Sequence, residues 1–193
     1  MRAFPVGVAI LVAIAGGALV ACGGGEKDAG SQHYQSQEWG FAFDYPPGWN
    51  ILSPQEAQER VTSLLPQSKL AVVLADSERR AFAIVGVQPA STAPGNDIEE
   101  IGAGLQQQSQ QASESIRLEG SQFMDLQGTR AFDYTISFPS DTASARDLMR
   151  QVMAFHADDF YAMAFVSTEG DYPSFQAAFD AILASFRWPD EKG

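Results

Sequence analysis

Residues 40–49 read GFAFDYPPGW, and this stretch decides the fold. Three large aromatic side chains, those of Phe41, Phe43 and Tyr45, alternate with a small and a polar residue. Such alternation is typical of a strand with one buried face, and the Pro-Pro-Gly that follows predicts a turn. Trp49 comes directly after that turn. We expect it to plug one end of a sheet rather than to contact a ligand.

Three segments downstream carry helix signals. Ser53 and Glu56 flank a proline in the order of a capping box with proline at the first helical position. Asn96 as N-cap with Glu99 at the third position predicts the start of a second helix, and the polar run QQQSQQAS after it either continues this helix or frays. The third helix is predicted from Asp171 onward, because the apolar residues there repeat at three- and four-residue steps.

Strands are predicted between these helices, and the last elements of the chain are several strands followed by the third helix. The expected strands cover residues 69–75, 81–87, 132–138, 146–156 and 160–166, with the last two paired as a hairpin. Strands that follow one another without helices between them favour antiparallel pairing. The order therefore predicts an α+β fold, a mostly antiparallel β-sheet flanked by helices.

The opening strand resembles that of PsbP-like domains, in which an aromatic strand runs into Tyr-Pro-x-Gly-Trp, here Tyr45 to Trp49. Residues 160–166 and the Ala-Ser-Phe close at Phe186 resemble the last strand and terminal helix of the same group. The resemblance implies an α-β-α sandwich over the folded part of the chain. It implies no catalytic residues, because proteins of this fold have unrelated roles.

The amino terminus has the shape of a secretory signal, with Arg2 as the only charge before an uncharged run over residues 3–21. The sequence Leu-Val-Ala-Cys that ends at Ala21 and Cys22 resembles the lipobox of bacterial lipoproteins. That resemblance implies cleavage between these two residues and lipidation of Cys22 with palmitate-type chains. Two acyl chains on one residue anchor a protein stably. The alternatives are an incidental cysteine after an ordinary signal peptide and an uncleaved membrane anchor.

These signals divide the chain into four parts: a lipoprotein signal peptide over residues 1–21, a flexible tether over 22–37, a PsbP-like domain over 38–188 and a tail over 189–193. His33 lies in the expected tether, where a solvated side chain is typical. Gly23 follows the cysteine in place of the aspartate that retains lipoproteins in an inner membrane. The outer membrane is therefore favoured if the host is Gram-negative, and otherwise the outer face of the cell membrane.

Composition excludes several classes of function. The 193-residue chain has 24 acidic and 12 basic side chains and a net charge of −12, which disfavours binding to nucleic acid. With two histidines and one cysteine, the chain has too few ligands for the common zinc sites and too few bases for the common catalytic triads. The side chains of His156, Asp158 and Asp159 could act as ligands of a metal ion, but their role as turn residues is the simpler interpretation. The pair Glu99 and Glu100 is expected on a solvated helix face.

We therefore predict no cofactor, no metal and no enzymatic activity. The hypothesis that remains is a lipid-anchored accessory or interaction module of the bacterial cell envelope, held at the membrane through Cys22 and contacting an envelope protein. The alternative is an envelope lipoprotein that binds a small ligand in a pocket between sheet and helix. An enclosed apolar cavity would favour that alternative, and a solidly packed interface would count against it.

Overall fold

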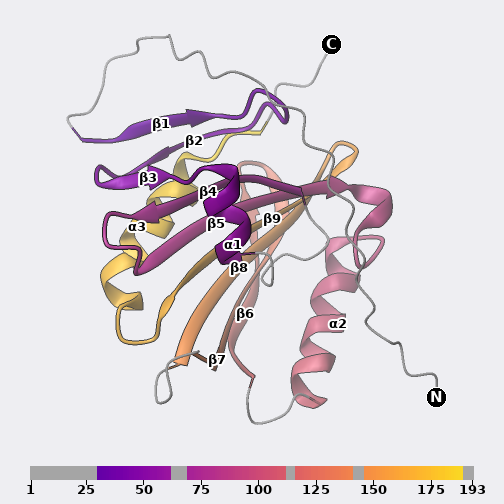
Figure 1. Ribbon diagram of the computed structural model, residues 1–193. Helices are drawn as coiled ribbons and strands as arrows, with labels where there is room; N and C mark the ends of the chain where they lie inside the picture. The colour runs from indigo at the N-terminus through magenta and orange to yellow at the C-terminus, as the bar shows by residue number, and fades with distance from the viewer. Residues whose placement is uncertain (1–29, 62–68, 112–115, 141–145, 189–193) are drawn as a thin grey trace.

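The computed structural model describes residues 30–61, 69–111, 116–140 and 146–188. Seven strands form one antiparallel sheet in the order β3-β4-β5-β9-β8-β7-β6, and β1 and β2 form a separate hairpin (Figure 1). The helical segments are α1 (Pro54–Val61), η1 (Ala90–Thr92), α2 (Ile98–Gln111) and α3 (Tyr172–Ser185). The strands are β1 (Gln32–Gln35), β2 (Ala42–Tyr45), β3 (Trp49–Ile51), β4 (Lys69–Asp76), β5 (Ala81–Pro89), β6 (Arg117–Leu126), β7 (Thr129–Pro139), β8 (Arg146–His156) and β9 (Asp159–Thr168). The predicted α+β architecture is confirmed.

The sheet has a hydrophobic core on each face, so the molecule is an α-β-α sandwich. Helix α3 and the β1–β2 hairpin cover one face, where α3 packs mainly on β2, β9 and β5. Helices α1 and α2 cover the other face, α1 over β4 and α2 over β6, β7 and β8 (Figure 1). Two cores form because the strands alternate in side-chain direction and each face offers apolar residues.

Aromatic side chains fill the core under α3. Phe41 and Phe43 of the quoted stretch are 0% and 1% exposed and stack on Phe186 at ring-centroid distances of 5.6 and 6.5 Å. Trp49 is 5% exposed and lies edge-on to Phe175 at 6.1 Å. The turn before it contains Gly48 at φ 85°, a conformation that glycine adopts without strain. The predictions for the opening strand, the turn and the packing of Trp49 are confirmed.

On the opposite face, a glycine brings α2 close to the sheet. A Cβ at Gly102 would lie 3.0 Å from two ring atoms of Phe132 and 3.1 Å from Phe123 Cζ. Phe132 is fully buried and Tyr134 is 8% exposed, and both side chains belong to the hydrophobic core on this face of the sheet. The absence of a side chain at Gly102 therefore sets the distance between helix and sheet.

The helix starts agree with prediction at α1 and α3 and differ by one residue at α2. The Glu56 backbone N–H donates to the Ser53 hydroxyl at 3.4 Å and the Ser53 backbone N–H donates to the Glu56 carboxylate at 3.1 Å, which confirms the capping box. Hydrogen bonds from Ser53 and from Arg79 lower the pKa of Glu56 to about 2. Helix α2 is capped one residue later than predicted, because Asp97 Oδ1 accepts from the Glu100 backbone N–H at 2.7 Å. The polar run continues this helix to Gln111.

Asp171 stands at the N-cap position of α3, as predicted, but its side chain makes no capping hydrogen bond. Its carboxylate accepts from the Thr168 hydroxyl at 2.9 Å and from the Arg80 guanidinium at 3.3 Å. The backbone of Asp171 is already helical, with φ −88° and ψ −21°, rather than extended as in a regular N-cap. Asp171 therefore ties the start of α3 to neighbouring segments instead of capping it.

The expected tether over residues 22–37 is too long at its carboxyl end. Strand β1 occupies residues 32–35 and pairs with β2, so the fold begins before residue 38. His33 is consequently a strand residue and not a linker residue, although it stays exposed, and its Nδ1 lies 2.7 Å from Asp44 Oδ1. The polar composition of this stretch gave no strand signal, because β1 is mostly exposed and forms by backbone pairing with β2 rather than by burying its own side chains.

Candidate interaction surface

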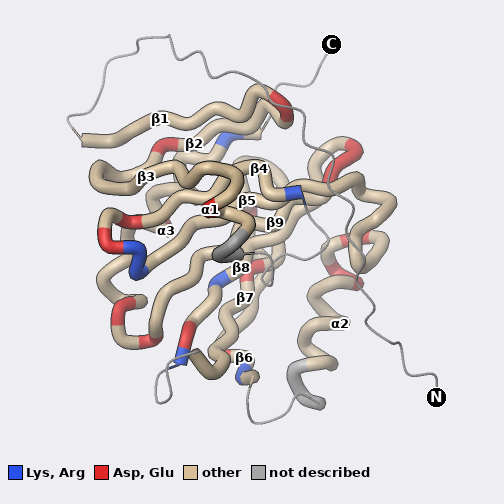
Figure 2. The backbone as a smooth tube through the Cα atoms, viewed as in Figure 1, with Lys and Arg blue, Asp and Glu red and all other residues tan. Residues whose placement is uncertain are grey.

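The sheet face that carries α3 is polar where it extends over β6, β7 and β8. Helix α3 borders this region and packs mainly on other strands. We call the region the polar sheet face and define it by residues Arg117, Glu119, Gln122, Asp133, Thr135, Ser137, Arg146 and Arg150. Three of the chain's 12 Lys and Arg residues lie on it, and Figure 2 shows basic residues toward the lower ends of these strands.

An ion pair between Arg150 and Asp133 lies in the middle of the polar sheet face. Arg150 Nε and Nη2 donate to Asp133 Oδ1 and Oδ2 at 3.0 and 2.9 Å, and Arg150 Nη1 donates to Asp180 of α3 at 2.6 Å. The Arg150 and Asp133 side chains are only 14% and 6% exposed. Burial disfavours the charged guanidinium, but the hydrogen bonds to the two carboxylates outweigh it and raise the pKa of Arg150. Arg150 therefore stays charged and links α3 to the sheet.

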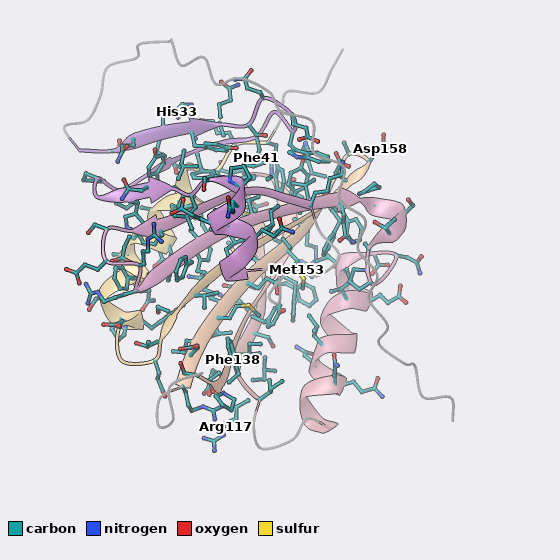
Figure 3. All side chains as sticks on the ribbon, viewed as in Figure 1. His33, Phe41, Arg117, Phe138, Met153 and Asp158 are labelled. Atoms are coloured by element: carbon teal, nitrogen blue, oxygen red, sulfur yellow. The ribbon has the colours of Figure 1, made fainter. Side chains whose placement is uncertain are left out.

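A second network lies nearer the lower end of the same face. Arg146 Nη2 donates to the Ser137 carbonyl at 2.8 Å and to the Ser137 hydroxyl oxygen at 2.9 Å. The Ser137 hydroxyl donates to Glu119 at 2.6 Å. Arg117 lies directly opposite Ser137 in the register, so both side chains are on the same face. Figure 3 shows Arg117 at the lower end of the sheet, far from His33 and Phe41.

These networks hold the side chains of Arg150, Asp133, Arg146 and Ser137 in defined positions. A surface whose long side chains are already ordered loses less conformational entropy on binding. Arginine is also enriched among the residues that contribute most to protein–protein binding. Asp133 and Ser137 are buried, whereas Arg117, Glu119 and Gln122 are exposed, so the part of the polar sheet face that is open to contact lies along β6. This face was not identified from the sequence, because its residues are far apart in the sequence and come together only through strand pairing.

The histidine and carboxylates predicted as a turn do form the β8–β9 turn. His156 ends β8, and its ring stacks on Trp188 with centroids 4.5 Å apart and planes inclined by 8°. Its Nδ1 lies 3.4 Å from the Thr129 hydroxyl. Asp159 pairs with His156 in the register, and burial together with the charge of Asp158 raises the pKa of Asp159. Among the residues that the structure describes, no three His, Cys, Asp or Glu side chains are grouped to hold a metal ion.

The carboxylates at the start of α2 have structural partners. Glu99 forms an ion pair with Arg130, and Glu100 accepts from the Asn96 backbone N–H at 2.9 Å. Beside them lies an open depression of about 500 Å³, at the junction of the helix with the β6–β7 and β8–β9 turns. Its lining residues are Ala90, Asn96, Asp97, Ile98, Glu99, Thr129, Arg130, Phe155 and Ala157. It is a surface feature and not the enclosed apolar cavity that a buried ligand would require.

The interface between α3 and the sheet is filled by its own side chains. Phe179 is fully buried, and its ring centroid lies 4.6 Å from that of Phe165 and 5.9 Å from that of Trp49. Such packing counts against a ligand pocket at this position. The predicted signal peptide with Ala21 and Cys22, and the predicted tail over 189–193, lie outside the described residues. Within the described part of the chain, no helix combines the length and apolar character needed to cross a membrane.

The architecture defines a class of protein: a PsbP-like α-β-α sandwich with a seven-stranded antiparallel sheet and a hairpin beside the terminal helix. A family model described as PsbP matches residues 29–188, so the chain belongs to the PsbP family. No curated protein sequence matches the chain significantly.

Solved structures agree with this fold. The cyanobacterial PsbP (CyanoP) of Synechocystis sp. PCC 6803 is 17% identical, with a TM-score of 0.56 over 88% of this chain and 98% of that chain. The Ran-binding protein Mog1p of Saccharomyces cerevisiae is 12% identical, with a TM-score of 0.52 over 83% and 96%. LpqN of Mycobacterium tuberculosis, involved in cell envelope biogenesis, is 11% identical, with a TM-score of 0.51 over 84% and 87%. At these identities the likeness shows the fold alone.

Proposed function

We propose that this PsbP-family protein is a non-enzymatic accessory module of the bacterial cell envelope that binds another envelope protein through the polar sheet face. The observation that carries the proposal is the pre-ordered network of Arg150, Asp133 and Asp180 on a sheet region that α3 borders but does not mainly cover. The envelope role of LpqN, a structural neighbour, is consistent with this assignment.

Anchoring is the second part of the proposal. The lipobox predicts that Cys22 becomes the acylated first residue of the mature protein, so that the domain is held at the membrane by lipid. In a Gram-negative host the missing aspartate after Cys22 favours the outer membrane. Replacing Cys22 with serine should release the protein from the membrane fraction and abolish labelling with radioactive palmitate. Unchanged labelling of the serine variant would refute lipidation at this residue.

The partner claim is tested by photocrosslinking in intact cells. A photoreactive amino acid is placed at Thr135, which lies on the polar sheet face opposite Arg150 in the register. The matched control places it at Gln107, an exposed position on α2, which covers the other face of the sheet. We expect one discrete envelope protein crosslinked from Thr135 and absent from Gln107. Equal products from both positions, or none from Thr135, would count against the polar sheet face as the binding site.

The small-ligand alternative has weaker support. It required a pocket between sheet and helix, whereas aromatic rings fill the space under α3 and the depression beside α2 opens to solvent. The accessory role is therefore the function that the geometry supports best.

A further inference from the structure

Arg117 is a basic side chain that has no counter-ion in the described part of the chain. It is exposed, and no hydrogen bond or ion pair joins it to another described residue. The chain has 24 acidic and 12 basic side chains, so an unpaired cation is the exception. Each of the other basic side chains that the structure describes contacts an oxygen atom of the chain, as those of Lys69, Arg130 and Arg187 do.

The residues of the polar sheet face around Arg117 carry an excess of positive charge. Arg117 lies opposite Ser137 in the β6–β7 register, and the Arg146 guanidinium donates to the Ser137 hydroxyl oxygen at 2.9 Å, so two arginines flank one serine. The carboxylate of this face beside them is that of Glu119, which accepts from the same hydroxyl at 2.6 Å. The charge of Arg150 is already compensated by its own carboxylate partners. The positive excess is therefore confined to the end of the face that holds Arg117.

We propose that Arg117 anchors the partner interface by binding a carboxylate of the partner protein, on an aspartate or glutamate side chain. The inference rests on the proposed function and adds the chemistry of the partner at this point. An exposed guanidinium without an ion pair forms a new one without first losing an old one. Its planar fork matches the two oxygens of a carboxylate, so the pair is bidentate and directional.

The residues beside Arg117 fit a protein surface better than a polyanion. Ile116 directly precedes Arg117 and is 47% exposed, one of three exposed large hydrophobic residues of the described chain. Protein interfaces combine apolar contact area with arginine side chains. A nucleic acid would bring many phosphates to one unpaired cation on a chain whose net charge is −12. A single acidic side chain within an otherwise uncharged protein surface matches both the arginine and the isoleucine.

Affinity measurements test the inference, with the envelope protein that is crosslinked from Thr135 and with full-length chains in detergent. We expect Arg117→Gln to weaken binding roughly tenfold and Arg117→Lys to weaken it less, because lysine keeps the charge but loses the fork. Arg187→Gln is the matched control, since it removes an exposed arginine after α3, and it should leave the affinity unchanged. Reversing one acidic residue of the partner to arginine should restore the binding of Arg117→Glu.

The outcomes separate this inference from the proposed function. A crosslink from Thr135 together with equal affinities for wild type and Arg117→Gln overturns the inference alone. It is also overturned if no single charge reversal in the partner restores the binding of Arg117→Glu. A lower urea midpoint of unfolding for Arg117→Gln overturns it as well, since Arg117 would then pair within its own chain. Absence of any protein crosslinked from Thr135 overturns the proposed function and the inference with it.

Discussion

The two glycines of α2 should respond in opposite directions to the same substitution. Alanine in a helix interior is favoured over glycine by about 1 kcal/mol, because glycine loses more backbone entropy on folding. At Gly104 a new Cβ would meet nothing within 4 Å, so the full gain should appear. For a domain of this size, 1 kcal/mol corresponds to a rise in Tm of about 2–4 °C.

At Gly102 the same Cβ would lie 3.0 Å from the ring of Phe132, well inside the distance of about 3.5–4.0 Å that carbon atoms prefer. Phe132 has little room to move, because it is fully buried and stacks on Tyr134 at 6.0 Å. Overpacking of this kind costs about 1–3 kcal/mol. Subtracting the helix gain leaves Gly102→Ala less stable than wild type by up to about 2 kcal/mol.

The assay is thermal and urea unfolding of the purified full-length protein in detergent, followed by circular dichroism. Wild type, Gly102→Ala and Gly104→Ala are compared under identical conditions. The expected order of stability is Gly104→Ala, then wild type, then Gly102→Ala. If Gly102→Ala were as stabilising as Gly104→Ala, the close approach of α2 to the sheet would be refuted.

Three further substitutions test the buried and capping interactions. Arg150→Met leaves the Asp133 carboxylate buried without its counter-ion and should lower the free energy of unfolding in urea by about 3–5 kcal/mol, whereas a loss typical of an exposed pair would refute this role. Tyr134→Phe leaves the side-chain oxygen of Gln151 without its buried hydroxyl donor and should cost about 1–3 kcal/mol. Burial raises the pKa of Tyr134 to about 12, so absorbance should show its phenolate forming there, and ionisation near pH 10 would contradict the packing. The pKa of Glu56 is about 2 in the fold and about 4.3 in an unfolded chain, so its contribution to stability is present above pH 4.3 and lost as the pH falls toward 2. Glu56→Gln should therefore make urea stability less sensitive to pH in that window, and an unchanged slope would contradict the lowered pKa.

The elements that could be predicted from the sequence are those with local signals. The alternation through Phe41 and Phe43, the capping box at Ser53 and the pairing of residues 146–156 with 160–166 each depend on neighbouring residues, and all three are confirmed. Strand β1 escaped prediction because its polar residues form a strand only against β2. The start of α2 was placed one residue early because Asn96 and Asp97 are both good capping residues, and only the backbone conformation selects between them.

The polar sheet face was beyond the reach of sequence patterning for a different reason. Asp133 and Arg150 are 17 positions apart in sequence, and neither belongs to a recognisable motif. Their pairing depends on the β7–β8 register, and Arg150 also donates to Asp180 of α3. Such a cluster is defined by tertiary structure alone. Cys22, by contrast, is marked by its local motif and needs no fold to be predicted.

The most direct test of the proposed function uses the envelope protein that is crosslinked from Thr135. Its binding affinity is measured for wild type and for two charge-reversed variants of this chain. Arg117→Glu changes an exposed side chain of the polar sheet face, and Arg187→Glu makes the same change at an exposed position after α3. We expect Arg117→Glu to weaken binding roughly tenfold or more, a change of about 1.4 kcal/mol, and Arg187→Glu to leave binding unchanged. Equal affinities for wild type and Arg117→Glu would contradict the claim that this face binds the partner.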